Sequence, residues 1–352
     1  MEYTRPKMDK KPPFNLLTAW ICTLLICWMY AGLFVDIWGH NHLKASSLES
    51  FFTPSHYVFY SGFSALAFFY IFLGLRNYRK GYTLKNLLPV GYNFSHILWF
   101  AIGGIFDFIW HATFGVEKNL DALISPAHVF LGIGTTLMLT APLRSIWGQT
   151  KLKNSLLNQL PLLICLVIIW TCYSVMTEYA HPIFQPVLSG VTFSRNSGQI
   201  FQAQGLGVAS IFIQTILMVS IVYINLFKRK FIAGSFIFLF TINSGLMSMM
   251  ASKSMSIDWN FVIGGFLAGL VSDLLYFFLK PSLQKPLSFQ IFSFFIAFVY
   301  NTLYFFSLYL GKGFWTSIHL TTGVVFESGI IIWFYSLIIL TAIKNAQNHY
   351  KE

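Results

Sequence analysis

The sequence FDFIWHATFGVEKNLDALISPAH, at Phe106–His128, places an aspartate four residues before a histidine and ends in Ser-Pro-Ala-His. An earlier segment, Val35–His56, reads VDIWGHNHLKASSLESFFTPSH and follows the same order. In both segments an acidic residue precedes the last histidine by seven positions. The pattern Asp-x3-His followed by [Asp/Glu]-x3-[Ser/Thr]-Pro-x-His therefore occurs twice, which predicts two copies of one helical hairpin.

The spacing within each copy is typical of a metal site. Residues i and i+4 share one face of a helix, so the aspartate and the first histidine point the same way. Ser or Thr before Pro predicts a helix N-cap, and the last histidine then lies in the first helical turn, where the dipole favours a neutral imidazole. Neutral imidazoles beside a carboxylate bind divalent transition metals. The predicted ligands are Asp36, His40 and His56 in the first copy and Asp107, His111 and His128 in the second.

Four further residues are candidates for supporting roles. Glu49 and Asp121 precede the predicted caps by one helical turn, which suits a general base or a residue that orients a ligand. His181 belongs to Glu178-x-x-His181, a spacing used by dimetal helical bundles, and His319 follows a possible cap as His56 does. Both histidines are additional metal-ligand candidates. The alternative is that each Asp–His pair is a structural hydrogen bond that ties a loop to a helix end.

The composition is that of an integral membrane protein. Of the 352 residues, 56% are hydrophobic and only 10% are charged, which favours an all-α polytopic fold over a soluble domain. Apolar runs predict about ten spans, each of the roughly 20 residues that a bilayer requires. The predicted spans are 14–38, 54–75, 88–111, 126–143, 159–180, 205–227, 231–251, 260–279, 288–310 and 316–342.

Charge placement predicts the orientation. Although the net charge is +11, 18 of the 23 basic residues fall in the termini and in alternate loops, as the positive-inside rule requires, so nucleic-acid binding is not expected. Both termini are predicted to be cytoplasmic in a plasma (inner) membrane, with the two repeats facing the periplasm or the exterior. Residues 1–150 form the repeat-bearing half with four spans, and residues 151–352 form a second membrane half with about six.

The segment from Phe106 to Arg144 resembles a group of uncharacterised bacterial multi-spanning membrane proteins, and the resemblance covers the first four spans. The Asp-x3-His pattern followed by another histidine is also similar to a copper site in the C subunit of membrane methane and ammonia monooxygenases. That similarity implies a metal at Asp107, His111 and His128, with Asp36, His40 and His56 as a second set. Here the last histidine lies farther along the chain and the motif is duplicated.

These features predict a membrane metalloprotein with one or two divalent ions, and copper, iron and zinc all remain open. As an enzyme it would be an oxidase or monooxygenase, or a hydrolase, of a hydrophobic or lipid-like substrate, with membrane lipids as its surroundings. A copper or zinc transporter or delivery protein is the alternative, and repeats without metal are a third reading. The shared repeat favours one centre built by both copies. The oligomeric state is left open.

Overall fold

The structure is a computed structural model that describes residues 15–43, 53–83, 94–115, 117, 120–147, 155–185, 197–311, 313 and 317–349. Within these ranges the regular structure consists of helices, without a β-strand. The chain divides into two compact units, unit 1 (Met1–Ile169) and unit 2 (Trp170–Glu352). The boundary falls inside one helix, α7 (Leu156–Met176).

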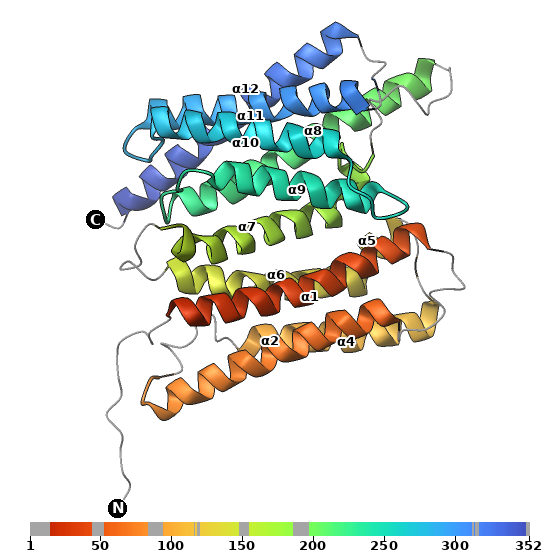
Figure 1. Cartoon of the computed structure of the whole chain (residues 1–352), viewed down its shortest axis with the longest axis vertical. Coiled ribbons are helices and arrows are strands. Elements are labelled where there is room, and N and C mark those ends of the chain that lie inside the picture. Colours follow the sequence, from red (N-terminus) through yellow and green to blue (C-terminus); the bar gives the residue numbers. More distant parts are fainter. Residues whose placement is uncertain are drawn as a thin grey trace, which may run out of the picture. The chain divides into compact units, whose positions relative to one another are not determined.

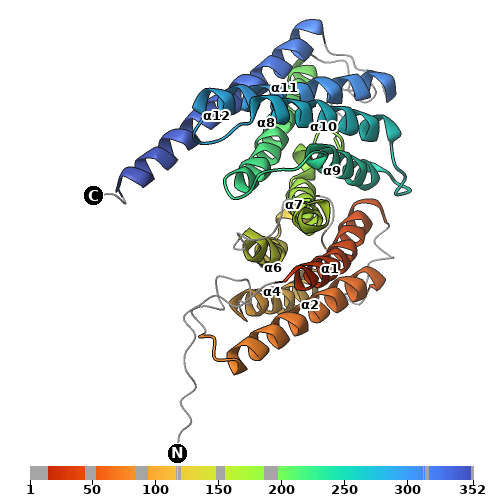
Figure 2. The same ribbon diagram turned by 60° about the vertical axis from the view of Figure 1, so that its left-hand side comes forward.

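Unit 1 is built from two antiparallel helical pairs. The helix α1 lies against α2, the helix α4 lies against α6, and α1 also contacts α6 (Figures 1 and 2). The short helix α5 leads from α4 into α6. The bounds are α1 (Leu16–His42), α2 (Pro54–Arg79), α4 (Phe94–Phe114), α5 (Leu120–Ile124) and α6 (Pro126–Trp147).

Unit 2 packs consecutive helices side by side from α9 to α12, and α8 contacts α11 and α12 (Figure 2). Buried amides connect these helices: Asn301 on α11 donates to Thr215 Oγ1 on α8 and to Ser328 Oγ on α12, each at 3.0 Å. Such hydrogen bonds hold helices together where no water competes. The bounds are η3 (Glu178–Ala180), α8 (Ser197–Leu226), α9 (Ser235–Ala251), α10 (Trp259–Leu279), α11 (Pro286–Gly311) and α12 (Ile318–His349).

The polytopic helical prediction is confirmed. Among the described residues, nine helices are long and apolar enough to cross a membrane. The remaining predicted span, 231–251, is the apolar helix α9, which has 17 residues and a length of roughly 26 Å. The largest differences from the predicted bounds are at α8 and α12: α8 begins at Ser197 rather than at residue 205, and α12 ends at His349 rather than at residue 342.

Two glycines allow α1 and α2 to touch backbone to backbone. A Cβ on Gly62 would lie 2.6 Å from the backbone of Met29, and a Cβ on Gly32 would collide with the backbone of Phe59. Small residues at such crossings permit close helix approach in membranes. Gly32 lies one turn before Asp36, so this contact sets the distance between Asp36 and His56.

We expect Gly32→Ala to destabilise unit 1 by about 1–3 kcal/mol, because the added methyl group meets backbone that cannot move aside. Thermal unfolding of the detergent-purified protein measures the loss. Gly205→Ala on α8 is the matched control, since a Cβ there meets nothing within 4 Å and the substitution should be neutral or slightly stabilising. Equal melting temperatures for the two variants would contradict the close-contact interpretation.

Candidate metal centre

The first triad joins the end of α1 to the start of α2. His56 Nε2 lies 3.1 Å from Asp36 Oδ2, and His40 Nε2 lies 3.8 Å from the same oxygen. Asp36 and His40 are one helical turn apart on α1, while His56 is supplied by the first turn of α2. All three side chains are buried. The predicted set Asp36, His40 and His56 is therefore brought together.

The second triad repeats this arrangement at the end of α4 and the start of α6. Asp107 Oδ1 lies 3.4 Å from His111 Nε2 and 3.1 Å from His128 Nε2. Asp107 is only 1% exposed, and His128 is partly exposed. In each triad one carboxylate oxygen thus faces the Nε2 atoms of two imidazoles.

The helix caps that hold the last histidines are confirmed. Thr53 Oγ1 accepts the backbone N–H of His56 at 3.2 Å, and Ser125 Oγ accepts that of His128 at 3.3 Å. A proline follows each cap and begins the helix. The Ser/Thr-Pro-x-His sequence therefore places each histidine side chain at the N-terminal turn of its helix.

The two copies differ in how the carboxylate is supported. Ser55 Oγ donates to Asp36 Oδ1 at 2.7 Å, which leaves Oδ2 to face the histidines. The corresponding residue in the second copy is Ala127, which has no hydroxyl group. Asp36 and Asp107 are therefore chemically different, although their triads have the same shape.

The two triads are adjacent. The ring centroid of His40 lies 6.1 Å from that of His128 and 6.5 Å from that of His111. Within the second triad, the rings of His111 and His128 are 5.3 Å apart. The distance from one triad to the other is thus similar to the distances within each, and the six side chains form one cluster at one end of unit 1.

Glu117 connects the two triads, and the sequence pattern did not identify it. Its backbone carbonyl lies 3.2 Å from His40 Nδ1, and its carboxylate lies 3.0 Å from His111 Nδ1. Because both groups are acceptors, they favour the proton on Nδ1 of each ring. The lone pair is then on Nε2, the nitrogen that faces the aspartate. This is how a carboxylate or carbonyl orients a metal-binding histidine.

Tyr60 is a second residue that the pattern missed. It lies one turn after His56 on α2, with its ring centroid 5.9 Å from that of His56. A Cβ on Gly104 would lie 3.2 Å from the Tyr60 ring, so the glycine leaves space for the tyrosine beside α4. The Tyr60 ring therefore lies beside the first triad and against α4, three residues before Asp107.

The geometry and the charge of the cluster fit a metal ion. In each triad the three candidate ligand atoms lie within 4.8 Å of one another, and ions with bonds of 2.0–2.1 Å hold tetrahedral ligands roughly 3.3 Å apart. Buried carboxylates are costly unless a positive charge accompanies them. A divalent ion supplies that charge and leaves the imidazoles neutral. The chain is thus a membrane-spanning helical protein with two buried His/Asp groups that could hold metal.

Of the other predicted residues, those that the structure describes are in neither triad. Asp121 is exposed on α5, and Glu49 is outside the described residues. His181 is in unit 2, where its Nδ1 accepts the backbone N–H of Ile183 at 3.2 Å and burial lowers its pKa to about 3. Glu178 precedes it in the 3-10 turn η3 rather than in a continuous α-helix. His319 is exposed at the start of α12.

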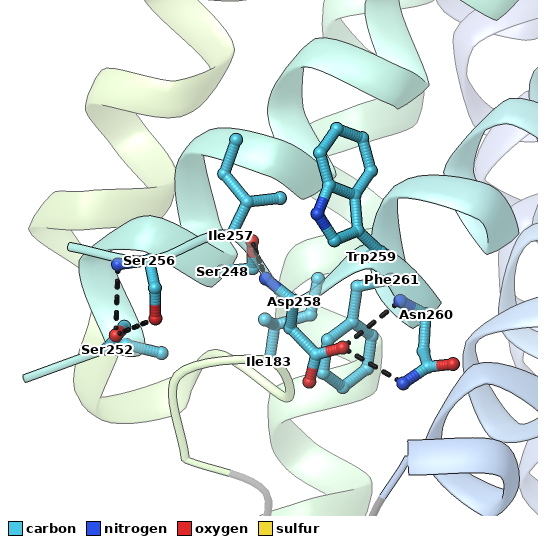
Figure 3. A pocket seen from close by; sticks show the side chains of 10 residues that line it. Ile183, Ser248, Ser252, Ser256, Ile257, Asp258, Trp259, Asn260 and Phe261 are labelled. Carbon is cyan, nitrogen blue, oxygen red and sulfur yellow. Dashed lines mark hydrogen bonds between the residues drawn. The ribbon is translucent and has the colours of Figure 1, made fainter. Parts of the chain in front are cut away.

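Unit 2 has a separate hollow between the end of α9 and the start of α10, with a volume of about 520 Å³ (Figure 3). Its polar groups bond to one another: Asp258 Oδ1 accepts both the backbone and the side-chain N–H of Asn260, and Ser252 Oγ lies 2.8 Å from Ser256 Oγ. These bonds cap α10 and shape the preceding turn. These hydrogen bonds explain why polar residues line the hollow, and no bound ligand is needed to explain them.

We expect Ser55→Ala to lower the stability of unit 1 by about 1.5–3 kcal/mol, since a hydrogen bond to a buried carboxylate is lost. Chemical or thermal unfolding in detergent measures the change. Ser61→Ala is the control on the same helix, because the exposed Ser61 hydroxyl donates only to the Val58 carbonyl of its own helix. An effect of Ser55→Ala no larger than that of Ser61→Ala would show that this bond does not support Asp36.

Comparison with known proteins finds no protein family, no curated protein and no solved structure that matches this chain. The function is therefore inferred from the residues of the two triads and from the contacts that orient them.

Proposed function

We propose that the chain is a membrane metalloenzyme whose two triads hold two divalent transition-metal ions in one centre. The observation that carries the proposal is the position of His40, which belongs to the first triad and lies about as close to the histidines of the second as to its own partner. The dual contact of Glu117 with His40 and His111 supports the same conclusion. Four imidazoles and two aspartates then surround the ions.

The donor set favours oxidation of a hydrophobic substrate. Each triad offers two histidines and one carboxylate, the set that binds non-haem iron and leaves positions open for oxygen and substrate. A bound iron ion would supply the redox chemistry. The chain's own residues orient the ligands through Glu117 and Ser55, and they place the Tyr60 phenol beside the centre. Zinc with the same ligands would favour hydrolysis, which is the second candidate reaction.

The position of the cluster along its helices supports an enzyme over a transporter. The ligands lie in the last turns of α1 and α4 and in the first turns of α2 and α6. Transport sites are generally near the midplane of the membrane, between broken helices. A centre at one end of the helices is accessible from a single side, which we propose to be the outer side because the basic residues mark the other.

We expect the purified protein to hold close to two metal ions per chain, with binding that weakens as the pH falls through roughly 6 to 7, because protons then compete for the imidazoles. Elemental analysis of the native protein and titration of the apoprotein with Co²⁺ measure this. The variant His111→Ala/His128→Ala should lose one ion. The absorption spectrum of the remaining Co²⁺ should also change, since the triads share one centre.

His319→Ala is the matched control, because this exposed histidine is in neither triad and its loss should leave the metal content unchanged. If the double variant keeps the full metal content, the triads are structural hydrogen bonds and the proposal fails. If it loses one ion while the spectrum of the other stays the same, the metals are bound in two independent centres. Net movement of metal across vesicles, abolished by the same double variant, would instead establish transport.

We expect Glu117→Gln to weaken metal binding about 10- to 100-fold, the usual effect of removing a carboxylate that orients a ligating histidine. The amide keeps the size of the side chain but loses the charge beside His111 Nδ1. Competition with a chromophoric chelator measures the affinity. Asp121→Asn, an exposed acid on the neighbouring helix α5, provides the comparison and should bind metal normally. Equal affinities for the two variants would rule out the orienting role of Glu117.

A further inference from the structure

A cavity of about 800 Å³ lies in unit 2, among the ends of α8 and α10 and the starts of α9 and α11. Its volume is within the range of sites that bind small molecules. Three lysines line it: Lys230 after α8, Lys280 at the end of α10, and Lys285 just before α11. They belong to the basic loops that predict the cytoplasmic side of the membrane.

The negative charge of the acidic residue in this cavity, Asp273, is already stabilised by backbone N–H groups. Asp273 accepts the backbone N–H groups of Phe236 and Ile237 at 3.4 and 3.1 Å. These amides are at the N-terminus of α9, where the helix dipole stabilises a negative charge. The carboxylate is therefore engaged by the helix end, and the lysines give the rim a net positive charge.

An apolar stripe extends from this rim along α10. Leu270, Leu274 and Phe277 all line the cavity, and they are 38%, 49% and 66% exposed. Their spacing of four and three residues puts them on one face of the helix. Lys280 lies beyond the end of this stripe, with its Nζ 6.0 Å from the centre of the Phe277 ring. Positive charge and exposed apolar surface thus meet at one helix end.

We propose that this cavity binds one anionic phospholipid. The lysines Lys230, Lys280 and Lys285 hold the phosphate, and the acyl chains lie along the stripe on α10. A site for a soluble anion would need the lysines but not the apolar stripe. Basic pockets between membrane helices on the cytoplasmic side have this character, since that leaflet is rich in anionic lipids.

Native mass spectrometry of the delipidated full-length protein, with added phosphatidylglycerol, tests the proposal. We expect one molecule of phosphatidylglycerol to bind, with phosphatidylcholine and inorganic phosphate binding at least tenfold more weakly. Lys280→Gln/Lys285→Gln should weaken phosphatidylglycerol binding by on the order of 30-fold. This is the change in affinity expected when the binding free energies of two lysines near the headgroup are lost together. A short-chain phosphatidylglycerol should also bind more weakly than the long-chain lipid.

The control is Lys253→Gln/Lys344→Gln, which removes the same charge from two exposed lysines that do not line the cavity. It should bind phosphatidylglycerol as the unmodified protein does. Equal losses in both double variants would show general electrostatic attraction and overturn the site. If inorganic phosphate binds as tightly as the lipid, the cavity is a site for a soluble anion. If phosphatidylcholine binds as tightly as phosphatidylglycerol, the lysines do not select the headgroup. Both double variants must give the same melting temperature as the unmodified protein.

Discussion

The structure of unit 1 depends on the burial of two carboxylates, Asp36 and Asp107, at one end of a bundle of apolar helices. An isolated ion in such surroundings is strongly unfavourable, so each carboxylate requires positively charged or hydrogen-bonding partners. Each of the two carboxylates faces two histidines: one histidine is on the same helix as the aspartate, and the other is at the start of the next long helix. This requirement explains why the hairpins, the caps and the close contact at Gly32 all bring the same residues together.

The cluster also shows how a motif that occurs twice can bring six side chains together in two unequal halves. The same spacing produces the same triad twice, and the triads meet at His40. The supporting contacts differ, since Ser55 holds Asp36 whereas Ala127 leaves Asp107 without that bond. Glu117, which comes from the second copy, contacts histidines of both. The two triads therefore have different surroundings.

The membrane fold and the two triads could be predicted because they follow from local rules. Apolar length gives the spans, the i, i+4 relation gives the Asp–His pairs, and Thr53-Pro54 and Ser125-Pro126 give the caps. Glu117 could not be predicted in this way, because it lies in the connection after α4, where no periodicity specifies the direction of a side chain. Asp121 shows a second limit: it matches the repeat but is exposed on α5, because helical spacing does not reveal which face is buried.

The polar contacts also bear on how the chain enters the bilayer. In unit 1, each aspartate finds its partners on its own helix and on the next long helix, so every hairpin supplies polar partners for its own carboxylate as soon as it forms. Asn301 is different, because its amide bonds to α8, which is made earlier, and to α12, which is made later. The same NH2 group also lies 3.1 Å from the Ala297 carbonyl of its own helix, so Ala297 and Thr215 can accept both amide hydrogens before α12 is made. The bond to Ser328 is thus added when α12 packs against helices that are already inserted, and the N-terminal hairpins can likewise be inserted one after the other.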